Sequence, residues 1–460
     1  MATQLEFSEQ YRPDWKPLEK WGFRIFSLFF LLQVLPIDWK FFRQLFGTQL
    51  HFKSVLDLTT FVPAIVSGSN VALWGIASYI NWGLYFLIAL GGAYGWHLYE
   101  KRGKSVDYNT LNYWFRVSLR YRLALGLLAF GFYKVFCLQM PYPSLSNLHT
   151  NYGDLLPWKV YFQTHAISPN YQSFLGWVEI AAAVLLFNRS TATFGAGLVL
   201  GFLGNITAAN LFYDIGHHLY ASFLVALALA ILAYDVPRLY QLIVKELPTS
   251  GQQFKPAFFT GNIGQLRIAS KGLFVAFGLL LGFLAWDNAK NDPFKTPHAA
   301  GLNDAYGYYI VDEFKYKGQP IAYSTTDPNR WQDVIFEKWA TASFKINRPV
   351  KIDLTEGDSI KTRDIDRNYE IAGLVGRHYF DYQIDSIQRI LTFQNKNRHH
   401  RNERYVLHYS IQANDDIILS GVDEKQDSIY ARLHKVDKDY MMYEGRRKQV
   451  KVKSIQASND

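Results

Sequence analysis

Charged side chains inside long apolar segments are the residues of this sequence best placed to carry chemistry. Glu179 lies in the apolar segment 171–187, which contains no basic residue. A carboxylate in such a segment must be protonated, paired or in contact with water, so Glu179 calls for a partner or a function. Lys134, near the end of the apolar segment 120–138, has the opposite charge and is a candidate partner.

Further polar residues occur in the neighbouring apolar segments, and under the topology derived below they all lie in the outer half of the membrane. We expect a polar site there made of Tyr133, Lys134, Gln139, Glu179, Asn205, Asn210, Tyr213, Asp214, His217 and His218. Such a site could bind a quinone head group, a lipid head group or a proton. The alternative is that Lys134 and Glu179 form a structural ion pair while the asparagines join helices. Both interpretations stay open.

The histidine and cysteine content argues against a metal, haem or disulfide centre. Neighbours such as His217 and His218 point about 100° apart on a helix, so they do not share one metal ion. A haem would need a second histidine across the bundle, and His149 and His165 lie in a loop, so haem is disfavoured. The single Cys137 excludes an internal disulfide and a CxxC motif. No metal site is predicted, the catalytic residues stay unknown, and quinone is the possible cofactor.

The elements that must position these residues fall into two halves of opposite character. Of the 460 residues, 22–286 contain nearly all the long apolar runs, and 287–460 are polar. A membrane span needs about 20 mostly apolar residues. Seven segments come close, so we expect an all-α membrane bundle of about seven helices, at 21–37, 74–98, 120–138, 171–187, 191–212, 216–234 and 268–286.

The distribution of basic residues predicts the orientation of these spans. With a cytoplasmic N-terminus, most basic residues of the short connecting segments lie on the cytoplasmic side, as the positive-inside rule requires. Seven spans then place the C-terminal half outside the cytoplasm. Because this half has no disulfide, we expect a bacterial inner membrane with the C-terminal half in the periplasm. The first segment carries Arg24 and could instead lie along the interface, which would invert every later orientation. The net charge of +9 is accounted for in this way, and no nucleic-acid partner is expected.

Alternating apolar and polar residues predict β-structure after a linker at 287–303. The expected strands are 308–318, 343–354, 382–394, 404–412, 417–422, 429–436 and 440–445. Short strands at this spacing predict an all-β barrel or sandwich, and a barrel could hold one small ligand inside. The predicted regions are a tail with two spans at 1–114, a four-helix core at 115–240, a loop and the last span at 241–290, and the β-rich domain at 291–460.

Several motifs of the predicted core resemble one membrane family. They are FYKVFCLQMPYPS (132–144), NYGDL (151–155), SPNYQSFLGWVEIAAAVLLFNRSTATFGA (168–196), NITAANLFYDI (205–215) and LAYDVPRL (232–239). Together they resemble the DoxX/DoxD-like membrane proteins, in particular the long Bacteroidetes-type members with a β-rich C-terminal domain. The resemblance implies a four-helix membrane core and association with quinone-linked oxidoreductases or oxidative-stress complexes. After Tyr213-Asp214 the chain departs from the family pattern with Ile-Gly-His-His.

Three functions follow from these observations. The first is a redox-associated membrane subunit, with or without catalysis, whose polar site contacts quinone or lipid beside respiratory partners. The second is an anchor that presents the periplasmic β-domain to a partner or ligand. The third is a membrane enzyme similar in plan to γ-carboxylases, with Lys134 as its base. Whether the chain is an enzyme stays open.

Overall fold

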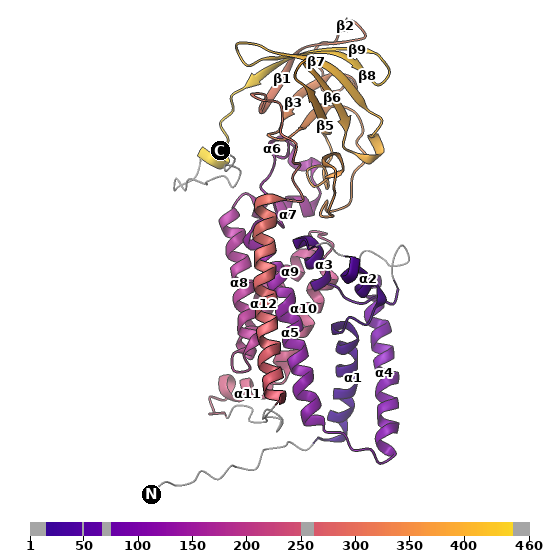
Figure 1. Ribbon diagram of the computed structural model, residues 1–460, viewed down its shortest axis with the longest axis vertical. Coiled ribbons are helices and arrows are strands. Elements are labelled where there is room, and N and C mark those ends of the chain that lie inside the picture. Colours follow the sequence, from indigo (N-terminus) through magenta and orange to yellow (C-terminus); the bar gives the residue numbers. More distant parts are fainter. Residues whose placement is uncertain (1–14, 48–49, 67–74, 250–261, 445–460) are drawn as a thin grey trace. The chain divides into compact units, whose positions relative to one another are not determined.

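The chain forms two compact units. A computed structural model describes residues 15–47, 50–66, 75–249 and 262–444 (Figure 1). The first unit comprises Met1–Tyr142 and Pro157–Pro293, and the second comprises Pro143–Leu156 and Phe294–Asp460. The short segment 143–156 therefore belongs to the second unit, although the chain on both sides of it belongs to the first.

The first unit is helical in its described part. Its helices are α1 (Pro17–Val34), α2 (Trp39–Gly47), α3 (Phe52–Thr59), η2 (Ile76–Tyr79), α4 (Ile80–Lys101), α5 (Tyr108–Val135), α7 (Pro157–Ala166), α8 (Pro169–Phe187), α9 (Ala192–Phe212), α10 (His218–Ala233), α11 (Val236–Leu239), the π-helix η4 (Tyr240–Val244) and α12 (Asn262–Asn291). Local sequence explains where the long helices begin. The Asp107 carboxylate caps α5 by accepting hydrogen bonds from the backbone N–H groups of Asn109 and Thr110, and Pro169 occupies the first turn of α8.

Among the described residues of this unit, four segments are long and apolar enough to cross a membrane. They are Pro17–Gly47, Ile76–Lys101, Ala192–Phe212 and Gly264–Asn291, and the bent pair His218–Ala233 and Val236–Val244 makes a fifth if it is one span. By length and composition alone, the described helices therefore give four or five candidate spans, fewer than the seven expected. Two expected spans, α5 and α8, fall short because their sequences are more polar: α5 contains Arg116, Arg120, Arg122 and Lys134, and α8 contains Asn170, Gln172 and Glu179.

Four helices pack in a closed ring. α5 lies against α8, α8 against α9, α9 against α10, and α10 against α5. α12 lies along the outside of α5 (Figure 1). The ring of Phe132 on α5 occupies the space that a side chain at Gly282 of α12 would need. α1 and α4 form a separate pair that meets this ring through α5. The helix α5 is thus the element that touches most of the bundle.

The second unit is built around a closed antiparallel barrel. Its strands are β1 (Gly307–Tyr316), β2 (Gln319–Pro320), β3 (Trp331–Phe336), β4 (Thr341–Ile346), β5 (His378–Asp385), β6 (Ile390–Asn395), β7 (Arg404–Ile411), β8 (Ile417–Asp423) and β9 (Ser428–Val436). From β3 onward each strand pairs with the next, β1 pairs with both β3 and β9, and β2 forms a short hairpin with β1. Eight strands therefore close an up-and-down barrel, and the barrel alternative of the sequence prediction is confirmed.

Aromatic side chains fill the inside of the barrel. The Trp331 ring lies 4.6 Å from that of Phe344, and Phe380 lies 4.9 Å from Tyr405, measured between ring centroids. Phe344, Phe380 and Phe393 have no exposed surface. The interior of an eight-stranded barrel is just wide enough for side chains to fill it, so these rings take the place that a ligand would need.

The strand predictions differ from the structure in four places. The predicted strand 343–354 is a strand only in its first part, because β4 ends at Ile346. The predicted strand 382–394 is a hairpin, because the chain turns between β5 and β6 at 386–389. The predicted strand 440–445 coincides with the short helix α13 (Met441–Glu444) in its described residues. The strand β3 was not predicted, because all six of its residues are buried and the sequence WQDVIF does not alternate.

Candidate functional site

Two glycines bring α5 and α8 into backbone contact. A Cβ atom at Gly176 would lie only 2.5 Å from the carbonyl oxygen of Gly131, and one at Gly131 would lie 2.7 Å from the Ile180 side chain. Small residues at a helix crossing allow such a close approach. Lys134 follows Gly131 by three residues and Glu179 follows Gly176 by three, so the crossing presents both charged side chains on facing helix surfaces.

Lys134 and Glu179 form a buried ion pair. The Lys134 Nζ atom donates to Glu179 Oε1 at 2.8 Å, and the two side chains are 8% and 3% exposed. The ammonium group also lies 5.4 Å from the centre of the Phe130 ring. The second oxygen, Glu179 Oε2, is buried and accepts no hydrogen bond within the part of the chain that the structure describes. One oxygen of the Glu179 carboxylate is therefore bonded to Lys134, and the other remains an unused acceptor.

The other predicted site residues are distributed over separate environments. Asn205, Tyr213 and Asp214 are exposed, and Asn210 donates to the Ile206 carbonyl oxygen of its own helix. Of the described side chains, none of these four forms a hydrogen bond or ion pair with Lys134 or Glu179.

The remaining predicted residues are wholly or partly buried. Tyr133 packs against the Phe52 ring, and His218 shares a hydrogen bond of 3.0 Å with the Ser78 hydroxyl. His217 lies partly buried with its ring centre 6.5 Å from that of Phe130. Gln139 is also partly buried, and its backbone N–H donates to the Tyr133 carbonyl oxygen. The predicted common depth of these residues in the membrane does not by itself bring them together in one pocket.

A second buried polar cluster joins α1, α4 and α5. The Arg24 guanidinium donates to Glu100 Oε2 and to the Tyr108 hydroxyl, both at 2.7 Å. Tyr108 in turn donates to Glu100, which also accepts from the Trp96 indole at 3.0 Å. Arg24 was noticed in the sequence only as a charge in the first apolar segment. Glu100 was not predicted as a site residue, and it meets Arg24 because α4 packs directly on α1.

In the second unit, Glu337 holds the segment 143–156 to the barrel. Its Oε1 accepts hydrogen bonds from the backbone N–H and the hydroxyl of Ser146, at 2.7 and 2.6 Å, and its Oε2 accepts from the Leu145 N–H at 3.2 Å. Burial, and secondarily the nearby Glu370 carboxylate, raises the pKa of Glu337 to about 7. The Glu337 carboxylate thus satisfies two backbone N–H groups and one hydroxyl group at the start of the short helical turn 145–148.

Four further contacts extend this network on two sides. Ser343 donates to the Ser146 hydroxyl at 2.8 Å and accepts from Arg377, which also meets Asp333 at 2.6 Å. On the other side, Lys396 and Glu370 pair at 3.4 Å.

Asn147 and Trp339 complete the second branch. The Asn147 amide donates to the Glu370 carbonyl oxygen and to the Tyr379 hydroxyl, and the Trp339 indole donates to the Glu370 carboxylate at 2.6 Å. The contacts of the segment 143–156 were not predicted, because the bonds from Leu145 to Glu337 and from Asn147 to Tyr379 join residues about 190 to 230 positions apart. The network is closed and buried, and it anchors the segment 143–156.

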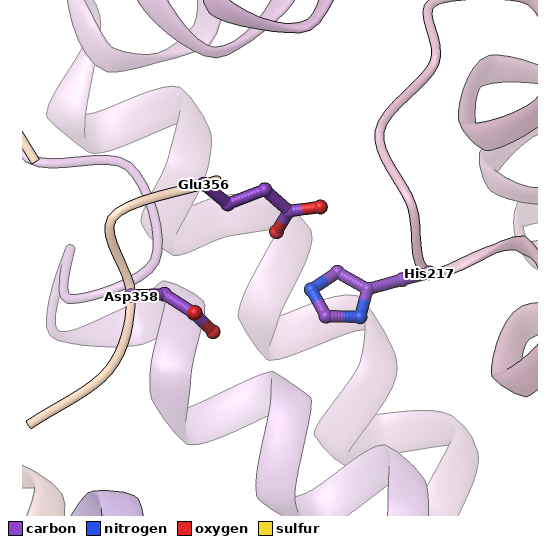
Figure 2. Close-up of side chains that lie close together, drawn as sticks. All are labelled: His217, Glu356 and Asp358. Atoms are coloured by element: carbon purple, nitrogen blue, oxygen red, sulfur yellow. The ribbon is translucent and has the colours of Figure 1, made fainter. Parts of the chain in front are cut away.

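The loop between β4 and β5 also brings two acidic residues together. Figure 2 shows Glu356 and Asp358 on this loop, with carboxylate oxygens within 4.8 Å of each other. The intervening Gly357 has φ of +64°, and a Cβ there would lie 2.6 Å from the Tyr369 Cα, so glycine is required. Figure 2 also labels His217, which precedes α10 in the helical unit. Within either unit taken alone, no three metal-ligating side chains gather among the described residues.

Comparison of the chain with family models, with curated proteins and with solved structures finds no match.

Proposed function

We propose that the protein is a membrane-anchored binding protein: the helical unit crosses a bacterial inner membrane and holds the barrel unit on its periplasmic side. The observation that carries this proposal is the segment 143–156. It lies in sequence between α5 and α7, yet it is built into the barrel unit by the buried hydrogen bonds of Glu337 and Asn147. The chain therefore connects the two units at three points, after Tyr142, Leu156 and Pro293.

This segment also restricts the number of membrane crossings. Residues 143–156 and 294–436 fold together, so they lie on the same side of the membrane. The chain between them must then cross an even number of times. Crossing by α9, α10 and α12 alone would be odd, whereas crossing by α8, α9, α10 and α12 is even. The parity thus favours α8 as a span whenever α10 is one, despite the polar composition of α8.

Under this proposal α5 is also a membrane span, because its charged side chains have partners inside the bundle. At about 1.5 Å per residue, its 28 residues are about 42 Å long, more than the roughly 30 Å of a hydrocarbon core. Lys134 pairs with Glu179, and Arg120 donates to the Leu186 carbonyl oxygen at the end of α8. Charges that are paired inside a bundle are the ones a membrane helix tolerates. Seven crossings then place the barrel opposite the N-terminus.

Cysteine labelling tests this arrangement in intact cells. In a Cys137→Ser background, we would introduce Ser105→Cys between α4 and α5 and, separately, Ser386→Cys on the exposed β5–β6 turn. Seven crossings predict that a membrane-impermeant maleimide labels Ser386→Cys from outside and Ser105→Cys only after permeabilisation. The four-span alternative, with α1, α4, α9 and α12, has an even total and predicts labelling of both from the same side. That result would reject the proposed topology.

A second candidate function is supported by the unused oxygen of the buried pair. Glu179 Oε2 could accept a hydrogen bond from a quinol or lipid hydroxyl, while Lys134 has further N–H groups to donate. The pair is one part of the larger polar site expected of a redox-associated subunit with respiratory partners, the role that the resemblance to the DoxX/DoxD-like proteins implies. Mass spectrometry of lipids and quinones retained by the purified protein tests it. Glu179→Gln should reduce the retained ligand, and an unchanged extract would count against the site.

A further inference from the structure

A surface hollow with an excess of positive charge lies on the barrel unit. It has a volume of about 600 Å³ and is formed by the loop between β4 and β5 together with the turn that follows β6. Its charged lining residues are Lys361, Arg363, Asp366, Arg398 and Arg401. Four cations and one carboxylate leave an excess of three positive charges. The volume lies within the range of small-molecule sites, which is roughly 300–1,000 Å³.

Asp366 fixes two of the arginines in place. It accepts from Arg363 Nε at 2.8 Å and lies 2.6 Å from Arg363 Nη2, and it accepts from Arg401 Nη2 at 3.2 Å. Arg401 also donates to the Lys396 carbonyl oxygen at 3.0 Å. Both guanidinium groups are therefore held in the wall of the hollow before any ligand binds. This reduces the loss of side-chain conformational entropy on binding.

The other two cations keep their hydrogen-bonding capacity. Within the described residues, the side chains of Arg398 and Lys361 form no hydrogen bond or ion pair with another part of the protein. Arg398 is exposed at the short helix η7 (Arg398–His400), and Lys361 is half-buried. Because neither side chain forms a hydrogen bond or a salt bridge with the described residues, we expect their replacement to change stability by about 1 kcal/mol or less.

From this arrangement we infer that the hollow binds a phosphate-bearing anion with two or more negative charges. Planar guanidinium groups match the oxygens of a phosphate in a two-point contact, and an ammonium group adds a further donor. The four cations outweigh Asp366, so a ligand with two or more negative charges gains more attraction in this hollow than a singly charged one. Ile360 and Ile365 in the same lining leave room for a carbon skeleton next to the phosphate. The inference rests on the proposed function, to which it adds the class of ligand bound on the surface of the barrel unit.

The binding test uses the full chain purified in a neutral detergent, with pyrophosphate as the probe in isothermal titration calorimetry. We expect saturable binding that weakens as salt is added, because the contacts are between exposed charges. Arg398→Gln should weaken binding by about tenfold, the loss expected for one charge-assisted hydrogen bond. Adding Lys361→Gln should weaken it by about tenfold again. The matched controls Arg404→Gln and Lys425→Gln remove exposed charges of the same unit outside the hollow and should change the affinity less than about twofold.

Two phosphate sources are distinguished by a second pair of probes. Short-chain phosphatidic acid that binds much more tightly than glycerol phosphate indicates a lipid head group, and equal affinities indicate a soluble phosphate ester. Either result supports the site. No saturable heat with any of these probes, or equal affinities in the wild type and in Arg398→Gln, would overturn it. The experiment is independent of membrane orientation, so it can succeed where the cysteine labelling fails, and the reverse.

Discussion

The helical unit and the barrel unit bury charged side chains in different ways. In the bundle, Lys134 and Glu179 have one another as hydrogen-bonded partners, and one carboxylate oxygen remains unused. In the barrel unit, Glu337 alone accepts three hydrogen bonds, two of them from backbone N–H groups. The backbone explains the difference. A helix satisfies its own N–H and C=O groups, so its charged side chains only need each other.

The segment 143–156 cannot satisfy its backbone N–H and C=O groups within itself in this way. Only Leu145–Leu148 and Tyr152–Asp154 are helical, in very short turns, and the remaining backbone groups must find other partners. Glu337, and the Gly373 carbonyl oxygen that accepts from the Leu156 N–H, supply them. Buried charge in the bundle therefore joins two regular helices, whereas in the barrel unit it completes an irregular backbone.

The largest effect should come from breaking the pair in the bundle on one side only. Lys134→Met leaves Glu179 as an unpaired buried carboxylate and should destabilise the bundle by about 3–5 kcal/mol. The double variant Lys134→Met/Glu179→Gln buries no charge and should recover most of that loss. Thermal unfolding of the detergent-purified protein measures both. Lys435→Met, which removes the surface pair with Asp415, is the control and should cost about 1 kcal/mol or less.

Equal stability of the single and double variants would contradict this prediction. It would mean that Glu179 finds another partner, or a proton, once Lys134 is gone. The buried carboxylate of Glu179 would then not depend on Lys134 as its single partner, and the contrast with the barrel unit would be lost.

The next effect is a pH dependence specific to the barrel unit. The pKa of Glu337 is about 7 in the folded protein and near its usual 4.5 when unfolded. Between these values the folded state binds a proton that the unfolded state does not, so this group makes stability fall as pH rises from about 4.5 to about 7. The shift corresponds to about 3 kcal/mol. Glu337→Gln should remove this slope in unfolding measured at several pH values.

Glu403 provides a control of opposite sign. Although burial acts to raise it, the pKa of Glu403 is lowered to about 2 by the hydrogen bond with His378 and the charge of Arg348. Its contribution is complete above the usual 4.5 and is lost as pH falls towards 2. Glu403→Gln should therefore lower stability at neutral pH and leave the slope between pH 4.5 and 7 in place. If Glu337→Gln also keeps that slope, Glu337 is not its source.

Sequence alone predicted the parts of the molecule that depend on local pattern. Long apolar runs located the helices α4, α9 and α12, and alternation predicted the barrel strands β7, β8 and β9. The membership of residues 143–156 in the barrel unit could not be predicted, because the bond from Ser146 to Glu337 joins residues 191 positions apart. Distant contacts of this kind leave no periodic signal in the sequence.

The candidate site shows the same division. The pairing of Lys134 with Glu179 was anticipated from their charges and common depth, and it is present. The partner of Arg24 was not anticipated, because Glu100 lies at the far end of a different apolar segment. The signal for the α5–α8 crossing was available in the equal spacing of Gly131 to Lys134 and of Gly176 to Glu179, which becomes informative only once the two helices are known to touch.

That crossing gives the smallest of the expected effects and the most direct test of how the bundle positions its charges. Gly176→Ala places a Cβ 2.5 Å from the Gly131 carbonyl oxygen, so the helices must separate, at a cost of about 1–3 kcal/mol. Gly197→Ala is the matched control, because a Cβ at this position of α9 meets nothing within 4 Å. It should be neutral or stabilising by up to about 1 kcal/mol, the gain in helix propensity. Thermal unfolding of both variants in detergent makes the comparison. Equal behaviour would show that α5 and α8 do not meet at Gly176, and the Lys134–Glu179 pair would then need another element to hold it together.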